Sequence, residues 1–202
     1  MNRAGFIAAP SRNKRTMNQI FSVLAIISNL GLLITFLLGW RISDPGSLSE
    51  LARNQVSNHF LFALGAILLT LLVHAIVLTY FMGTGRWIEE TCEAYRFEGA
   101  ARQENIRLKY RVIPGMVGCM FLLILTGAFG AMSDPAANVR VPSAHWIHLS
   151  LAILTLTANF ATSILEFQMI RRNGALVDLV YREVQTVRRE HGLDVKTPAP
   201  GA

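Results

Sequence analysis

The chain has 202 residues, of which 52% are hydrophobic and only 16% are charged, and its mean hydropathy is +0.39. These values are unusual for a soluble domain of this length and indicate a membrane protein. The formal net charge of +6 does not call for a nucleic-acid partner, because basic residues beside a membrane face anionic lipid.

Four segments of the chain contain no Lys, Arg, Asp or Glu. They cover residues 16–40, 54–85, 112–133 and 141–165. Each is long enough to cross about 30 Å of hydrocarbon as an α-helix, the structure that satisfies all of its backbone groups internally. The sequence therefore predicts an all-α fold, an integral membrane four-helix bundle that runs up-down-up-down.

Basic residues predict the orientation of the bundle. Of the 19 Lys and Arg residues, only Arg41, Arg53 and Arg140 lie in the connections after the first and third spans. The positive-inside rule then places both termini in the cytoplasm, and the expected location is the bacterial cytoplasmic (inner) membrane. The first apolar run is too long for a signal peptide and is interpreted as a retained span.

The expected organisation follows from these segments. Amphipathic patterning after the second and fourth spans predicts short cytoplasmic helices, the last with valines at coiled-coil spacing that would dock on residues 86–111, on lipid or on a partner. The predicted parts are a cytoplasmic tail (1–17), a first transmembrane hairpin with a cytoplasmic extension (18–97), a cytoplasmic connection (98–111), a second transmembrane hairpin (112–172), a cytoplasmic amphipathic helix (173–193) and a disordered tail (194–202).

The two hairpins resemble each other in sequence. "ISDPGS" at 42–47 returns as "MSDPAA" at 132–137, an offset of 90 residues. Downstream the offset is 89, pairing His59 with His148 and Gly85 with Gly174, where a hinge is expected. Because both hairpins begin on the same side, they would be parallel repeats about an axis along the membrane normal. That symmetry places the two histidines at equal depth near the outer surface, facing each other.

Polar residues form one stripe on each of two spans. At 100° per residue, the polar side chains of the fourth span share one face of the helix. Polar groups in a span face the bundle interior, so these stripes are predicted to line its centre. The stripe of the fourth span is His148, Thr155, Asn159, Thr162 and Glu166, and that of the second is His59, Ala63, Ala66, Thr70 and His74.

The paired histidines have three interpretations. His59 and His148 would supply both axial ligands of a b-type haem standing between the second and fourth spans, among small residues. With His145, they would instead form a zinc or copper site. The third interpretation is that the histidines are wet, interfacial and bonded to loop backbone.

A second polar site is expected deeper in the bundle. His74 lies about 22 Å below His59 along the helix, at the depth of Thr162 and Glu166, with Asn159 one turn higher. A buried His–Glu pair would relay protons, hold a quinone or form a neutral interhelical hydrogen bond. The remaining polar residues and glycines of the spans are expected to serve helix packing.

The chain contains no nucleotide-binding loop, dinucleotide fingerprint, covalent haem motif or protease and hydrolase signature. It is therefore at most an electron-transfer subunit and not a stand-alone enzyme. Three functions are expected: an anchor or accessory subunit of a larger redox complex with one haem; a structural or assembly protein without cofactor; or a small proton- or solute-translocating module using His74, Asn159 and Glu166. The expected partners are membrane lipid, other membrane subunits or a second copy, and quinone.

Overall fold

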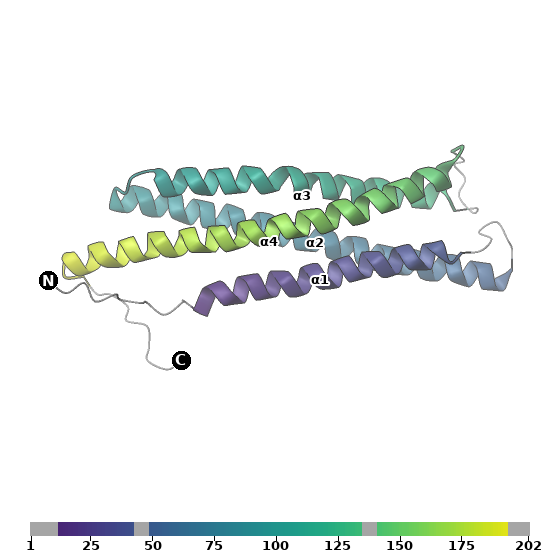
Figure 1. Cartoon of the computed structure of the whole chain (residues 1–202), viewed down its shortest axis with the longest axis horizontal. Helices are drawn as coiled ribbons and strands as arrows, with labels where there is room; N and C mark the ends of the chain where they lie inside the picture. The colour runs from purple at the N-terminus through teal and green to yellow at the C-terminus, as the bar shows by residue number, and fades with distance from the viewer. Residues whose placement is uncertain (1–11, 43–48, 135–140, 194–202) are drawn as a thin grey trace.

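The computed structural model describes residues 12–42, 49–134 and 141–193, and almost all of this part of the chain is helical. The helices lie side by side and alternate in direction (Figure 1). Each is long and apolar enough to cross a membrane. The all-α, four-span prediction is therefore confirmed. The helices are α1 (Arg12–Trp40), α2 (Glu50–Tyr95), α3 (Ala100–Met132) and α4 (Ala144–Glu190).

Most of the predicted tail 1–17, most of the two Ser-Asp-Pro turns and the predicted disordered tail 194–202 lie outside the described residues. Two names are useful for the ends of the bundle. The histidine end is where α1 meets α2 and α3 meets α4. The terminal end holds the start of α1, the α2–α3 connection and the end of α4 (Figure 1).

The two histidine-bearing helices lie next to each other at the centre. α1 packs on α2 and α4, α3 packs on α4 and α2, and α2 also contacts α4. Among the described residues α1 and α3 make no contact. Side chains on the facing sides of α2 and α4 therefore meet in the bundle interior.

The outside of the bundle is apolar along every helix. Ile26, Leu61, Phe121 and Phe160, one from each helix, are all more than half exposed. A continuous apolar surface of this kind is solvated by lipid chains and not by water. The architecture thus belongs to an integral membrane protein.

The helices do not stop where the apolar segments stop. Gly85 and Gly174, expected as hinges, lie inside α2 and α4, which run on to Tyr95 and Glu190. The short separate helices expected beyond them are instead continuations of α2, α3 and α4. A glycine costs a helix only about 1 kcal/mol relative to alanine, which neighbouring packing offsets.

A cluster of buried apolar side chains at the terminal end provides this packing. Val180 of α4 lies against Ile88 and Cys92 of α2, and all three are buried. Of the three expected docking surfaces for the last segment, the structure shows the first, residues 86–111. Burial raises the pKa of the Cys92 thiol, so the thiol stays protonated.

Local hydrogen bonds define both ends of α2. The Ser49 side chain accepts a hydrogen bond from the Ala52 amide at 3.3 Å and caps the start of α2. At the other end Arg96 takes a left-handed conformation (φ 54°), and the Phe97 amide donates to the Cys92 carbonyl at 3.0 Å. This tight reversal lets α3 return antiparallel to α2.

Candidate functional site

His59 of α2 and His148 of α4 meet at the histidine end. Their ring centroids are 6.2 Å apart and the ring planes are inclined by 80°. The structure thus brings together the two residues that the sequence offset pairs. Both side chains are partly buried; His59 is the tenth residue of α2, and His148 is the fifth residue of α4.

Each histidine makes the same hydrogen bond within its own hairpin. His59 Nδ1 lies 3.0 Å from the carbonyl oxygen of Thr35, and His148 Nδ1 lies 3.0 Å from that of Thr126. A carbonyl oxygen only accepts, so each Nδ1 carries the proton and donates. In the neutral ring Nε2 then keeps its lone pair, which is the tautomer that a metal ligand requires.

Each histidine also packs on one glycine of the preceding helix. A Cβ at Gly39 would stand 2.8 Å from His59 Cε1, and a Cβ at Gly130 would stand 2.9 Å from His148 Cε1. Both distances are shorter than any normal carbon contact. Each imidazole therefore occupies space that any side chain at Gly39 or Gly130 would fill.

The two rings line a partly open cavity, named here the histidine cavity, of about 990 Å³. Its walls come from all four helices and are mostly apolar, with small residues beside the rings. This volume lies at the upper end of the range for small-molecule and cofactor sites. The small residues that line it are Gly39, Ala63, Gly127, Gly130 and Ala152, and the lining also includes Trp40 and Trp146.

His145 does not join the pair as a third ligand. Its ring stacks at a tilt on Trp146, with the centroids 5.0 Å apart. Within the described ranges, no three His, Cys, Asp or Glu side chains gather closely enough to hold a metal ion. The geometry therefore does not support the three-histidine zinc or copper site.

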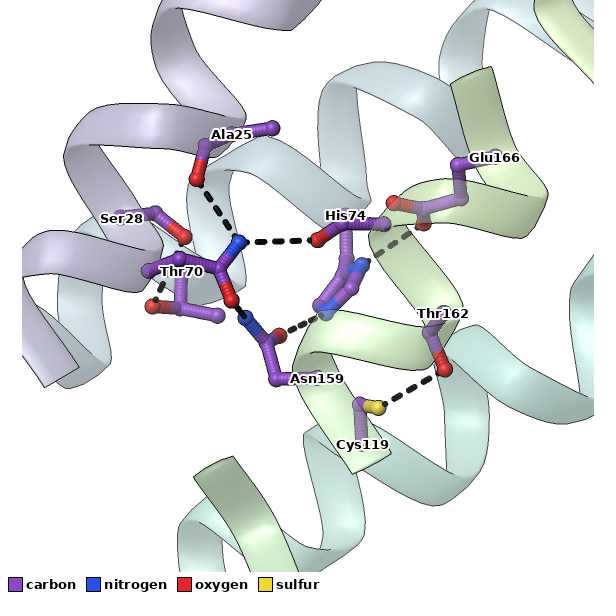
Figure 2. Close-up of polar contacts among 10 residues, drawn as sticks. Ala25, Ser28, Thr70, His74, Cys119, Asn159, Thr162 and Glu166 are labelled. Atoms are coloured by element: carbon purple, nitrogen blue, oxygen red, sulfur yellow. Dashed lines mark hydrogen bonds and ion pairs between the residues drawn. The ribbon is translucent and has the colours of Figure 1, made fainter. Parts of the chain in front are cut away.

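A second polar site lies in the middle of the bundle (Figure 2). His74 of α2 uses both ring nitrogens: Nδ1 lies 2.8 Å from Glu166 Oε1, and Nε2 lies 3.0 Å from Asn159 Oδ1. All three side chains are fully buried, with exposed fractions of 0–1%. The sequence stripes predict this meeting of α2 and α4, and the structure shows the contacts.

The network continues to α1 through an asparagine that was expected only to pack. Asn159 Nδ2 donates to Asn29 Oδ1 at 3.1 Å, and Asn29 Nδ2 donates to the Ala25 carbonyl at 2.8 Å and to Ser163 Oγ at 3.1 Å. The Ala25 carbonyl fixes the orientation of both asparagine amides. A carbonyl only accepts, so Asn29 must turn its Nδ2 toward Ala25 and its Oδ1 toward Asn159. Asn159 Oδ1 must therefore face His74, and His74 Nε2 must carry a proton.

Two details complete this site. Glu166 Oε2 is buried and has no hydrogen-bond partner in the structure. Thr162, predicted beside Glu166, accepts instead from the Cys119 thiol of α3 at 3.2 Å. Thr162 therefore joins α4 to α3 and does not touch His74 through a hydrogen bond.

A third polar layer, closer to the terminal end, was not anticipated from the sequence. Asn105 donates to Asn173 Oδ1 at 2.7 Å, and Asn173 donates to Thr84 Oγ1 at 2.8 Å. Gly85 makes room, since a Cβ there would stand 2.7 Å from Asn105 Oδ1. The available signal was the 89-residue offset between Thr84 and Asn173, which places both at the same depth.

Together these features define a membrane-spanning four-helix bundle with two facing histidines in a cavity at one end and a buried His–Glu pair at its centre. No family model matches the chain, and the comparisons with curated proteins and with solved structures also find no match.

Proposed function

We propose that this protein is a membrane-embedded anchor or accessory subunit of a larger redox complex and carries one b-type haem between His59 and His148. The observation that carries the proposal is that the two rings have the same tautomer and the same kind of hydrogen bond. Each donates Nδ1–H to a helix carbonyl and keeps Nε2 for a metal.

The spacing of the rings fits this role. The two ring centroids are 6.2 Å apart, and both rings line the histidine cavity, so His59 and His148 would be the residues that hold the iron. When bound, the haem would supply one-electron chemistry, while the chain supplies both ligands, their orientation and an apolar enclosure.

The proposal includes an origin by duplication. Thr35 and Gly39 stand 91 residues before Thr126 and Gly130, and each pair contacts its histidine in the same way. We take the two hairpins as copies whose shared features converge on one cofactor. By the positive-inside rule the haem would lie toward the outer side of a bacterial inner membrane, with both termini in the cytoplasm.

An optical spectrum of the protein purified in detergent tests the proposal. Wild-type protein is expected to show a Soret band and a reduced-minus-oxidised difference spectrum of a low-spin haem. His59→Ala and His148→Ala are each expected to abolish the low-spin signal. His145→Ala and His191→Ala serve as controls, since both rings lie outside the pair, and should leave the spectrum unchanged.

A wild-type protein that neither carries haem as purified nor binds added haem would overturn the proposal. The structural or assembly role would then stand, with the polar residues acting as interhelical contacts. That role predicts that replacing either histidine leaves the activity of a partner complex unchanged.

The translocating role is less favoured by the fold. Carriers commonly unwind helices near the membrane midplane. In the described part of the chain each of the four helices is continuous. Proton flux into liposomes that disappears with Glu166→Gln would restore this alternative.

A further inference from the structure

Glu166 is the first carboxylate after the charge-free segment 141–165, and it is 0% exposed. It faces His74 from the neighbouring helix, so the two form a buried ionisable pair. Burying a charge costs several kcal/mol unless the charge is compensated. The number of protons on this pair is therefore decided by its hydrogen bonds.

The hydrogen bonds fix one proton and leave three positions for others. His74 Nε2 carries a proton because Asn159 Oδ1 faces it. The remaining positions are His74 Nδ1 and the two oxygens of Glu166. With no proton between Nδ1 and Oε1, two lone pairs would oppose each other at 2.8 Å around a net charge of −1. With one proton shared there, the pair is neutral overall and the contact is a hydrogen bond.

A second proton has one place to go. Nδ1 and Oε1 already share theirs, so Glu166 Oε2, which has no hydrogen-bond partner, is the position left open. Among the described residues, the groups that the other helices bring to the pair carry no fixed charge: α1 contributes the Asn29 amide, and α3 contributes the Cys119 thiol beside His74. On α4 the neighbouring groups are the Asn159 amide and the hydroxyl groups of Thr162 and Ser163.

The opposite side of the pair is closed to protons. His74 Nε2–H donates to the Asn159 amide, which donates to the Asn29 amide, and Asn29 in turn donates to the Ala25 carbonyl and the Ser163 hydroxyl. Amide groups hold hydrogen bonds in a fixed direction and do not readily pass a proton along. Exchange therefore takes place through the carboxylate.

From this geometry we infer that His74 and Glu166 form a proton-binding site in the membrane interior. The site holds one shared proton at rest, when the pair is neutral, and takes a second proton on Glu166 Oε2 only on acidification, when the pair carries a net charge of +1. It is separate from the histidine cavity, about 22 Å away along α2, and does not depend on a haem.

Infrared spectroscopy of the full chain in detergent, recorded as a function of pH, tests this site. On acidification, wild-type protein should develop the carbonyl stretch of one buried, protonated carboxylic acid per chain, with a shift in D₂O. Glu166→Gln should remove this band. Glu93→Gln, at an exposed position of α2, is the matched control and should retain it.

The glutamine variant is expected to fold. Its amide N–H would donate to His74 Nδ1, while Nε2–H keeps its bond to Asn159, so the histidine remains neutral and paired. His74→Gln provides an independent second test. Without the imidazole a carboxylate at this position would be a buried charge with no cationic partner, so the neutral acid is expected, with the band present even at neutral pH.

A wild-type spectrum without the band at any accessible pH would overturn the inference, as would a band that survives Glu166→Gln. A neutral-pH spectrum of His74→Gln without the band would also overturn it. Because these spectra need no haem, the failure of the haem proposal and the failure of the proton site are separate results.

Discussion

Gly39 and Gly130 are the residues on which the histidine cavity can be tested most directly. An alanine at either position would place its Cβ within 2.9 Å of an imidazole carbon. The ring would have to move, at a cost of about 1–3 kcal/mol as in other overpacked sites. We therefore expect Gly39→Ala and Gly130→Ala each to lower the thermal stability in detergent and to reduce haem content severalfold.

The chain offers matched controls for these substitutions. Gly65 and Gly118 lie inside α2 and α3 with nothing within 4 Å of an added Cβ. Alanine there should be neutral or stabilising by up to about 1 kcal/mol. If all four variants behaved alike, the two ring-contacting glycines would have no special role.

At the level of single residues, the sequence predicts pairs better than it predicts bonding partners. The meetings of His59 with His148 and of His74 with Glu166 follow from offset and helical periodicity alone. The bonds from Nδ1 to the Thr35 and Thr126 carbonyls do not follow, because nothing in the sequence distinguishes those carbonyls from others in a helix. The role of Asn29 was missed because the inward face of α1 depends on how that helix rotates against α2 and α4.

At the scale of the helices, Gly85 and Gly174 provide a contrast. Both stand at equivalent positions, but a Cβ at Gly85 would press on Asn105 Oδ1 at 2.7 Å, whereas one at Gly174 would meet only Tyr80 at 3.8 Å. We expect Gly85→Ala to break the buried Asn105–Asn173 bond and to destabilise the protein by about 1–3 kcal/mol. Gly174→Ala should be neutral or slightly stabilising.

Thermal unfolding in detergent, followed by circular dichroism, compares the two variants. Equal losses of stability would mean that both glycines act as flexible points and not through packing. Asn105→Ala should be destabilised to a similar degree as Gly85→Ala, and the double variant should lose less than the sum, because both changes act on the same bond.

The ends of the apolar segments predict which part of each helix lies in lipid. They do not predict where the helix itself ends. A charge-free run is required only inside hydrocarbon, whereas a helix continues for as long as its next turns find packing partners. Ile88, Cys92 and Val180 provide such partners. The segments that carry these residues alternate polar and apolar positions as an ordinary soluble helix does. The sequence therefore predicted helices there without showing that they continue the spans.

For the molecule as a whole, the orientation is the prediction that matters most. From the distribution of basic residues, the positive-inside rule predicts that the terminal end lies in the cytoplasm and the histidine end outside. In a variant lacking Cys92 and Cys119, a cysteine introduced at Pro142 should react with a membrane-impermeant maleimide in intact cells. A cysteine introduced at Glu190 should react only after the cells are permeabilised.

Both positions are exposed in the structure, so labelling reports sidedness and not burial. The reverse pattern would invert the bundle and place the histidine cavity on the cytoplasmic side. It would leave the internal geometry of both polar sites as described.

The length of the two central helices fixes how far the protein reaches from the bilayer. α2 and α4 have 46 and 47 residues, or about 70 Å each at 1.5 Å per residue, against about 30 Å of hydrocarbon. Since Arg171 and Arg172 are the first basic residues after the charge-free part of α4, the last 18 residues, 173–190, extend beyond the hydrocarbon. At 1.5 Å per residue this is about 27 Å, so a partner bound at the end of α4 is held roughly 20 Å clear of the lipid headgroups. Whatever recognises that tip need never touch the membrane.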